Sequence, residues 1–472
     1  MDAWVKRTAG DFFVQRRPSI TARSVALAVL TRVESGNAYA NILLAEQLAN
    51  SPLDARDRGL CTELVYGTLQ QMRLLDAWLQ TCLQRSLQSL DSNVRWILRM
   101  TAYQLLHLDR IPDYAAIHAA VEMCKISAPR ASGFVNGVLR NLMRRGSPRQ
   151  QLDRLLQNVT DPIERQALSL SLPTWIYAGL SQRYGAEAAT RMLEAQNHPV
   201  PLSVRVNLLR TNREELLQRL HHQLGEGAAE SSPLCEEAVH LRLSQDVRSL
   251  DVYGDGWMTL QDEGAMLVVE AVDPQAGERV LDMCAAPGGK TTHMAERMGN
   301  QGRIDALDVH LHKVRSIKEA ASRLGIDIIH PRLLDARKAS NQPPLQEVYD
   351  AVLLDAPCSG FGVLRHRPDI RWRRSPADIE SLKVLQQELL WNAARFVRPG
   401  GRIVYSTCTL WAEENELLVE RFLLEHKEFQ VVAVPRLERL LAGRHLTQLG
   451  YLLSPEWYAT DGFYMVRLEK QV

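Results

Sequence analysis

Two cysteines in the second half of the chain lie in motifs whose residue types could perform chemistry. Cys358 is part of Asp355-Ala356-Pro357-Cys358-Ser359-Gly360, and Cys408 is part of Ser406-Thr407-Cys408-Thr409. A free thiol of ordinary pKa is only a few per cent ionised at neutral pH, yet it is nucleophilic and easily activated by its neighbours. A lone buried cysteine is usually a small core residue. Two cysteines at the ends of expected strands, beside an acid, favour nucleophilic catalysis instead.

Two thiols and a carboxylate suit conjugate addition to an electron-poor ring. C5 of cytosine is too weakly nucleophilic to attack a methyl sulfonium unaided, but addition of a thiolate at C6 gives an enamine-like ring whose C5 can attack. An acid near N3, for which Asp355 is the candidate, would stabilise the developing charge. A base must then remove the C5 proton so that the thiol can leave. The residues alone do not say whether Cys358 or Cys408 attacks.

A third motif, Asp282-Met283-Cys284-Ala285-Ala286-Pro287-Gly288-Gly289-Lys290-Thr291, lies between an expected strand and an expected helix. Its small residues let the backbone approach a ligand closely, and the helix N-terminus offers N–H groups. Asp308 ends the next strand, 19 residues after Gly289, where a carboxylate can accept hydrogen bonds from ribose hydroxyls. This combination indicates a cofactor that carries adenosine.

A phosphate-binding P-loop is the main alternative for this motif, because Gly289-Lys290-Thr291 resembles the end of one. A P-loop also needs a glycine five residues before Gly289, and Cys284 occupies that position. A tight turn without any ligand is a further alternative, which the acid at Asp308 disfavours.

An arginine-rich segment, residues 365–374, directly follows the Pro-Cys motif. It contains five arginines and one tryptophan, which suit phosphate contacts combined with a platform for base stacking. The alternative is an ordinary solvated loop. Because the segment adjoins the expected crevice, we predict RNA contacts for Arg365, Arg367, Arg371, Trp372 and Arg373.

Alternating short apolar runs and helical patterns must position these motifs from about residue 261 onward. The expected strands are Arg279–Met283, Arg303–Asp308, Asp327–His330, Tyr349–Asp355 and Arg402–Thr407. The expected helices between them are Thr291–Met298, His310–Leu324 and Ile379–Phe396. This alternation predicts a parallel sheet with helices on both faces and a ligand beyond the carboxyl ends of its strands. A last strand, Gly462–Leu468, is expected to close the sheet edge.

The rest of the chain divides into a helical part and a mixed part. Between Ser19 and Arg145 the apolar spacing is helical, with helices expected at Asp57–Leu83, Val94–Leu108, Tyr114–Ser127 and Ala131–Arg144. Gly146-Ser147-Pro148 breaks that pattern, a helical linker follows, and strands are expected at Ser203–Asn207 and Val239–Leu243. We therefore predict three domains, at residues 20–146, 147–260 and 261–472.

Composition indicates a globular protein with a polyanionic partner. The 472 residues are 46% hydrophobic and 24% charged, and no apolar run approaches the roughly 18 residues of a membrane span. Seven scattered cysteines without a Cys-x-x-Cys motif fit a reducing cytoplasm and support neither a disulfide framework nor a metal cluster. Residues 1–150 contain 19 Lys and Arg against 12 Asp and Glu, and only two of those 19 are lysines. Arginine matches phosphate oxygens well, although a solvated helical face would have the same composition.

The motifs resemble the RNA cytosine-5 methyltransferases that use S-adenosylmethionine. The front third resembles the NusB-like RNA-binding domain at Leu98–Leu106 and Gly133–Arg140, and Tyr458–Tyr464 resembles the closing strand of the methyltransferases. This fusion is similar to the bacterial 16S ribosomal RNA methyltransferases of the RsmB (Fmu/Sun) family, from about residue 20 to Leu468. The resemblance implies an all-α NusB-like bundle, a small α+β module and an α/β Rossmann-like methyltransferase domain.

The resemblance also implies roles for individual residues. Cys408 matches the family's nucleophile, and Cys358 matches the cysteine that assists later steps, either proton removal or product release. Asp355, the candidate acid of the catalytic site, also matches a cofactor position. The matching cofactor positions are Cys284, Ala285, Ala286, Pro287, Gly288, Gly289, Lys290, Asp308, Asp335 and Asp355. The implied substrate is 16S ribosomal RNA, at the family's target cytosine 967. We further expect no metal, no membrane association, a monomer and a cytoplasmic location.

Two other functions remain open at this point. One is methylation of cytosine C5 in transfer RNA by an enzyme of the same superfamily. The other is a non-catalytic NusB-like protein that binds RNA or a transcription complex. The presence of Cys358, Cys408 and Asp355 together favours a catalyst, because a binding scaffold has no need of two thiols there.

Overall fold

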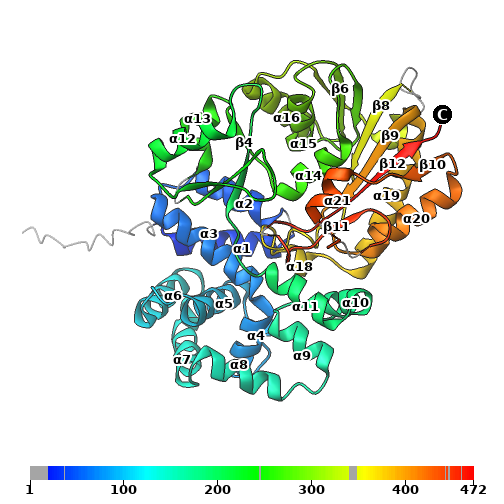
Figure 1. Ribbon diagram of the computed structural model, residues 1–472. Coiled ribbons are helices and arrows are strands. Elements are labelled where there is room, and N and C mark those ends of the chain that lie inside the picture. The colour runs from blue at the N-terminus through cyan, green and yellow to red at the C-terminus, as the bar shows by residue number, and fades with distance from the viewer. Residues whose placement is uncertain are drawn as a thin grey trace, which may run out of the picture. The chain divides into compact units, whose positions relative to one another are not determined.

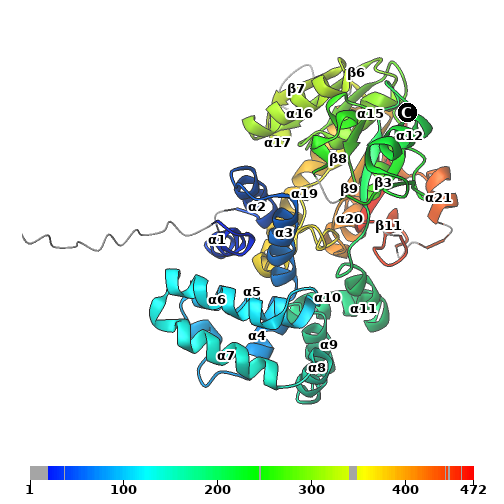
Figure 2. The same cartoon turned by 90° about the vertical axis from the view of Figure 1, so that its left-hand side faces the viewer.

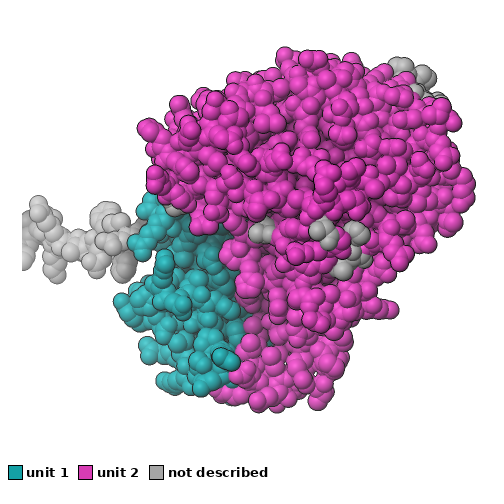
Figure 3. Space-filling model, viewed as in Figure 1, with its two compact units in different colours: residues 1–68, 75–151 teal, residues 69–74, 152–472 magenta. Residues whose placement is uncertain are grey.

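The computed structural model describes residues 20–36, 38–243, 246–339, 348–441, 443–444, 447–458 and 460–472. Ser19, where the first helical pattern was expected to begin, and Ala459, within the motif Tyr458–Tyr464, lie outside these described residues. The chain forms two compact units (Figure 3). One comprises residues 1–68 and 75–151, and the other comprises residues 69–74 and 152–472.

The first unit is helical. Its helices are α1 (Ala22–Glu34), α2 (Ala40–Ala49), α3 (Ala55–Gln70), α4 (Met72–Gln80), α5 (Ser92–His107), α6 (Asp113–Ser127), α7 (Ser132–Arg144) and the start of α8 (Pro148–Gln157). Helix α5 begins at the N-cap Asp91, whose side chain accepts hydrogen bonds from two backbone N–H groups. It packs against α1, α6 and α7 and is buried along most of its length. The predicted all-α bundle is confirmed, with α5 at its centre.

One expected helix of this region, Asp57–Leu83, is divided into α3 and α4 at Gln71. The division falls within residues 69–74, which belong to the second unit. There the Arg73 guanidinium donates hydrogen bonds to the backbone carbonyl of Leu172 and to the carboxylate of Glu164. Contacts distant in sequence therefore interrupt a pattern that is helical locally.

The second unit begins with α9 (Pro162–Ser169), α10 (Thr174–Tyr184) and α11 (Ala186–Ala195), which precede a small antiparallel sheet. Its strands are β1 (Leu202–Val206), β2 (Ala229–Ser231), β3 (Ala238–Leu241) and β4 (Met258–Leu260), in the order β2-β3-β1-β4. Two helices, α12 (Arg213–Leu224) and α13 (Asp251–Gly254), pack against its buried apolar side chains. This is the predicted small α+β module.

A larger, mixed sheet forms the rest of this unit (Figure 1). It contains β5 (Arg279–Asp282), β6 (Arg303–Asp308), β7 (Ile329–Leu333), β8 (Tyr349–Asp355), β9 (Val397–Thr407), β10 (Phe429–Val431) and β12 (Phe463–Lys470), with β11 (Tyr451–Leu453) paired to β12. The order is β10-β12-β9-β8-β5-β6-β7. Strands β5 to β9 run parallel, and β12 pairs antiparallel with β9. The predicted parallel sheet is therefore present, with an antiparallel extension.

Helices cover both faces of this sheet (Figure 2). One group comprises α14 (Glu263–Val272), α15 (Gly289–Arg297) and α16 (Leu311–Leu324), and the other comprises α17 (Ala336–Ala339), α19 (Pro376–Phe396) and α20 (Glu416–Glu425). The remaining helices are the short α18 (Ile370–Arg373) and α21 (Pro435–Leu441). The sheet core is formed by apolar side chains of neighbouring strands, among them Val280, Ala306, Leu353, Val404 and Met465. Such strands, buried on both faces, are apolar along most of their length.

The strand expected at Gly462–Leu468 does not close the sheet edge. It is β12, which lies between β9 and the three-residue strand β10. The sequence shows β12 clearly because five of its eight residues, Phe463–Val466 and Leu468, are apolar and buried. Strand β10 is too short to produce a recognisable pattern in the sequence. Strand β12 was therefore expected at the edge of the sheet, where β10 lies.

Candidate active site

The carboxyl ends of the parallel strands bring the predicted motifs together. Strand β5 pairs with β6 on one side and with β8 on the other, so the order of connection reverses at β5. In the sheet register Asp355 lies beside Ser406, and Asp282 lies beside Leu353, two residues before Asp355. The cofactor motif after β5, the Pro-Cys motif after β8 and the Thr-Cys motif after β9 therefore share one edge. Such a reversal point is where open α/β sheets bind ligands.

The two cysteines of the motifs face each other at this edge. The Sγ atoms of Cys358 and Cys408 are 3.3 Å apart, and both residues are partly exposed. The intervening backbone is closely packed, since the Gly362 N–H donates to the carbonyl of Cys408 and the Gly462 N–H donates to the carbonyl of Gly362. A Cβ atom on Gly362 would lie 2.0 Å from the Gly462 carbonyl oxygen. Only glycine permits this approach.

A lysine and an aspartate adjoin the thiols. The Lys290 Nζ donates a hydrogen bond to Asp355 Oδ2 at 2.7 Å, and the Ser406 Oγ donates to Asp355 Oδ1 at 2.9 Å. The Lys290 ammonium also lies 5.1 Å from the centre of the Phe463 ring. Burial opposes the charge on Lys290, but the Asp355 carboxylate outweighs it and raises the pKa of the lysine. The ammonium is therefore a permanent positive charge at the site.

The surrounding charges distinguish the two thiols. A hydrogen bond from Cys358 lowers the pKa of Cys408, and the positive charges of Lys290 and Arg367 act in the same direction. The pKa of Cys358 is raised by its interaction with Cys408, by burial and by the negative charge of Glu414. Burial and the Asp355 carboxylate oppose ionisation of Cys408, but the hydrogen bond from Cys358 and the two cations outweigh them, so Cys408 is the thiol that ionises first.

The predicted cofactor residues line the turn between β5 and α15 and the ends of the next strands. Gly288 has φ +106°, and a Cβ on Gly289 would meet no atom within 4 Å, so the backbone there borders open space. Asp308, at the end of β6, accepts a hydrogen bond from its own loop at the His310 N–H. Its second oxygen is 3.9 Å from the Lys313 ammonium, which leaves it able to accept from a ligand. The remaining predicted positions of the turn, Cys284, Ala285, Ala286, Pro287 and Lys290, lie between these elements.

Asp335 follows β7 and starts α17. Its carboxylate accepts hydrogen bonds from the backbone N–H and the guanidinium of Arg337. These contacts lower its pKa. The side chain is thus an ionised carboxylate at the same sheet edge, held by its own turn.

The arginine-rich segment divides into buried and exposed side chains. Arg371 is fully buried, where it donates to the Asn197 side chain at 2.7 Å and to the Gln70 carbonyl at 3.3 Å. Burial without a carboxylate partner at hydrogen-bond distance lowers its pKa to about 9. The Trp372 indole donates to the Leu69 carbonyl at 2.7 Å. These side chains attach the segment to residues 69–70, which belong to the same compact unit.

The other arginines of the predicted RNA contact differ from Arg371. The Arg365 side chain is only 4% exposed and lies 3.7 Å from Asp461. Arg367 is exposed, and Arg373 is partly exposed. The segment therefore presents Arg367 and Arg373 at its surface, whereas Arg365 and Arg371 contact other parts of the protein.

Two polar residues that no sequence motif indicated also contact the cysteine loops. Glu414 and Gln386 are both fully buried, and each forms hydrogen bonds with the loop that contains Cys358. Glu414 lies six residues after Cys408 in an acidic stretch, and Gln386 lies in the middle of α19. A run of acidic residues was the only available signal for Glu414, and such a run resembles an ordinary surface segment.

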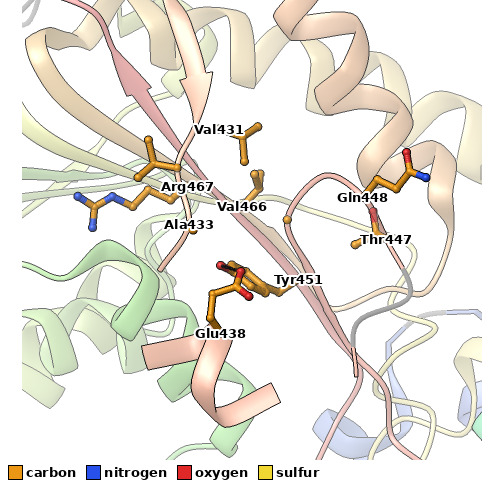
Figure 4. A pocket seen from close by; sticks show the side chains of 10 residues that line it. Val431, Ala433, Glu438, Thr447, Gln448, Tyr451, Val466 and Arg467 are labelled. Atoms are coloured by element: carbon orange, nitrogen blue, oxygen red, sulfur yellow. Dashed lines mark hydrogen bonds between the residues drawn. The ribbon is translucent and has the colours of Figure 1, made fainter. Parts of the chain in front are cut away.

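Another pocket of about 730 Å³ lies away from these motifs, between β10, α21 and β12 (Figure 4). Three of its polar side chains have protein partners, since the Tyr451 hydroxyl donates to Glu438 at 2.7 Å and Arg467 pairs with Glu469. Among the described residues, no cluster of three His, Cys, Asp or Glu side chains could hold a metal ion. No helix in the described ranges is both long and apolar enough to cross a membrane.

Comparison with known proteins agrees with this architecture. Three family models match: the 16S rRNA methyltransferase RsmB/F model at residues 269–469, the NusB family at residues 20–144, and the ferredoxin-like domain of RsmF/B-like methyltransferases at residues 172–248. The probable ribosomal RNA small subunit methyltransferase B of Bacillus subtilis is 40% identical over 96% of this chain and 99% of its own. The chain belongs to the ribosomal RNA small subunit methyltransferase B family. It is thus an enzyme of the 16S ribosomal RNA methyltransferase class.

Further relatives and solved structures support this assignment. The probable ribosomal RNA small subunit methyltransferase B of Synechocystis is 34% identical over 96% of this chain and 100% of its own. The crystal structure of PH0851 superposes with a TM-score of 0.79 at 27% identity, over 96% of this chain and 100% of that chain. NSun6 from Pyrococcus horikoshii, solved with the S-adenosylmethionine analogue SFG, gives a TM-score of 0.55 at 23% identity over 63% of this chain and 98% of that chain. The last similarity concerns the fold.

Proposed function

We propose that this family member methylates C5 of a cytosine in 16S ribosomal RNA through a covalent bond between a cysteine Sγ and C6 of the base. The observation that carries the proposal is the pair of thiols 3.3 Å apart beside the Lys290–Asp355 ion pair. Among the functions open to a methyltransferase, only attack at a weakly nucleophilic ring carbon requires a thiol adduct. The family's target, cytosine 967, is the site that we propose to test first.

Cys408 is the proposed nucleophile, because its thiol is the more easily ionised of the two. Its Sγ forms a bond to C6, and the electron pair of the C5–C6 double bond moves so that C5 becomes nucleophilic. Lys290 and Asp355 form an ion pair beside the thiols, and an acid near N3 of the ring would stabilise the charge that develops in the adduct. A fixed ammonium–carboxylate pair needs little reorganisation during the reaction.

Cys358 is the proposed base for the second half of the reaction. After methylation, C5 carries both a methyl group and a proton, and loss of that proton restores the ring and expels the Cys408 thiolate. Cys358 must first release its own proton to solvent, after which the raised pKa makes its thiolate a good acceptor for the C5 proton. Its Sγ lies 3.3 Å from that of Cys408, which supports a role for both thiols at the same ring.

S-adenosylmethionine is the proposed cofactor and would supply an electrophilic methyl group on a sulfonium. The open space in front of Gly289 and the acid Asp308 fit a nucleoside with ribose hydroxyls. Residues Cys284–Lys290, Asp308, Asp335 and Asp355 would hold it. Arg367 and Arg373 at the surface of the adjoining segment are the proposed phosphate contacts. We further propose that the enzyme acts as a monomer in the cytoplasm.

The test is transfer of labelled methyl from S-adenosylmethionine to unmodified 16S ribosomal RNA, with denaturing gels that detect protein–RNA adducts. We expect wild type to methylate one cytosine and Cys408→Ala to give neither product nor adduct. Cys358→Ala should accumulate the adduct, because addition succeeds and elimination stalls. Cys82→Ala, which removes a thiol from the helical unit, is the matched control and should behave as wild type.

Other outcomes would overturn parts of this proposal. An adduct in Cys408→Ala but not in Cys358→Ala would exchange the roles of the two thiols. Label on transfer RNA but not on ribosomal RNA would change the substrate. Methylation by the double variant that lacks both thiols would exclude the covalent route.

A further inference from the structure

Glu414 forms a hydrogen-bonded centre beneath both thiol loops. It ends the short turn Ala412–Glu414 after β9, and its side chain is completely buried. One carboxylate oxygen accepts the Ser359 hydroxyl, and the other accepts the Ser359 N–H at 2.9 Å and the Gln386 side-chain amide at 2.8 Å. Both oxygens act as acceptors, and these hydrogen bonds favour the ionised carboxylate against burial, which raises the pKa of Glu414.

These contacts reach each side of the thiol pair. Ser359 directly follows Cys358, and its hydroxyl also lies 2.7 Å from the hydroxyl of Thr409, which directly follows Cys408. The Gln386 amide donates at the same time to the Pro357 carbonyl at 2.9 Å. The Glu414 network thus holds the residues on both sides of Cys358 and is connected by one hydroxyl pair to the residue after Cys408.

A buried carboxylate of this kind is not explained by stability alone. The donors to its oxygens are the neutral groups of Ser359 and Gln386, and the Arg374 guanidinium, which donates to the Ser359 and Cys358 carbonyls, adds a favourable charge nearby. Burying a charge in this way is costly. A neutral or apolar side chain could fill the same volume. The carboxylate is the group that can accept from the Ser359 N–H, the Ser359 hydroxyl and Gln386 simultaneously.

We propose that Glu414 is a positioning residue that sets the separation and mutual orientation of the Cys358 and Cys408 thiols. Its role in catalysis rests on the proposed function, because it acts by aiming Cys358 at the adduct that Cys408 carries. Loss of the carboxylate should let the Pro357–Ser359 loop shift. A shift of about 1 Å between reacting groups is enough to slow a reaction by ~10²-fold.

The separation of the thiols can be measured without any RNA. Diamide accepts the two electrons and two protons that the thiols release when their sulfurs bond, and the rate of disulfide formation depends on how closely they approach. We would follow formation of the Cys358–Cys408 disulfide by peptide mass spectrometry. Wild type, Glu414→Gln and the neighbouring control Glu413→Gln would be compared, with Cys358→Ala as the blank.

We expect Glu414→Gln to form this disulfide at least roughly tenfold more slowly than wild type, with Glu413→Gln unchanged. In a single turnover with 16S ribosomal RNA, Glu414→Gln should form the adduct and release it more slowly, so adduct accumulates without a change in affinity for S-adenosylmethionine. Glu414→Asp, which keeps the charge on a shorter side chain, should restore part of both rates. A merely structural role would not separate adduct formation from release.

Equal disulfide rates in wild type and Glu414→Gln would overturn the proposal. If Glu414→Gln fails to fold, Thr409→Val, which lacks only the hydroxyl that connects the two loops, decides by the same two measurements. If wild type forms no adduct with any RNA, the proposed function fails, whereas the diamide experiment still tests whether Glu414 positions the thiols.

Discussion

Replacement of Asp282 by asparagine should remove the part of the pH dependence of folding stability that this carboxyl group contributes. Asp282 ends β5 beneath the cofactor turn and is almost completely buried, with one oxygen accepting the Thr291 hydroxyl at 2.7 Å. Burial, with a smaller effect of the Asp355 charge, raises its pKa from 3.8 to about 7. The folded protein therefore retains a proton on Asp282 at pH values where the unfolded chain has released it.

The sign and size of the effect follow from these two pKa values. The stabilisation by the retained proton is fully present below the unfolded pKa of 3.8 and is lost as the pH rises through about 7. Each pH unit within this window changes the free energy of unfolding by about 1.4 kcal/mol. Between pH 5 and pH 8 the contribution of Asp282 should fall by roughly 2–3 kcal/mol. Asparagine has no such proton. The free energy of unfolding of Asp282→Asn, relative to wild type, should therefore rise by that amount between pH 5 and pH 8.

The assay is urea unfolding of wild type and Asp282→Asn at pH 5 and pH 8, at equal ionic strength and without cofactor. The quantity to compare is the difference in free energy of unfolding between the two proteins, measured at each pH. The other titrating groups contribute equally to both proteins and cancel in this difference. Six of the nine tryptophans lie in the second compact unit, so fluorescence would report mainly on that unit. Unfolding should therefore be followed by circular dichroism, which reports on both units.

Asp305 on the neighbouring strand β6 provides the matched control. It is also fully buried, but hydrogen bonds from Arg303 and Tyr349 outweigh the effect of burial and lower its pKa. Asp305→Asn should therefore destabilise the protein by the same amount at pH 5 and pH 8, since both values lie above its titration. A raised pKa of Asp282 is refuted if the difference in free energy of unfolding between Asp282→Asn and wild type is the same at both pH values. It is also refuted if wild type becomes more stable relative to the variant as the pH rises.

Other substitutions test the remaining features of the site and its support. Lys290→Met removes the cation beside the reactive thiol, so the pH midpoint of thiol alkylation should rise and adduct formation should fall at least about tenfold. Gly289→Ala should fold normally and bind S-adenosylmethionine more weakly, whereas Gly362→Ala should lower the melting temperature, because its Cβ would lie 2.0 Å from a backbone oxygen. Arg205→Met alone should lower the free energy of unfolding by about 3–5 kcal/mol, because it leaves the fully buried Glu296 without its partner. The double variant with Glu296→Met should recover much of that loss, as measured by urea unfolding.

Local sequence pattern was sufficient for the elements that place the catalytic motifs. Strands β6 and β8 begin and end where they were predicted, because each is a run of apolar residues that ends in an aspartate. Helix α16 starts one residue after its expected beginning. Apolar periodicity and a polar terminus are local properties, and buried parallel strands display them strongly.

Contacts between distant residues determined what local pattern missed. The break between α3 and α4 results from the contacts of Arg73 with residues about 90 to 100 positions away. The buried Arg371 side chain likewise contacts Gln70 and Asn197, which are distant in sequence. The composition of residues 365–374 alone therefore predicted a surface arginine. Glu414 and Gln386 acquire their importance only when β9 and α19 are packed together.

The site distinguishes two chemically identical side chains by their hydrogen bond and by the charges around them. The hydrogen bond from Cys358 lowers the pKa of Cys408, and Lys290 and Arg367 act in the same direction against burial and the Asp355 carboxylate. The interaction with Cys408, burial and the Glu414 charge raise the pKa of Cys358, so that of two thiols 3.3 Å apart Cys408 is the more easily ionised. Both effects depend on the same sheet edge, since Lys290 follows β5, Cys358 follows β8, and Cys408 and Glu414 follow β9. The fold therefore assigns the proposed roles by which strand each side chain follows.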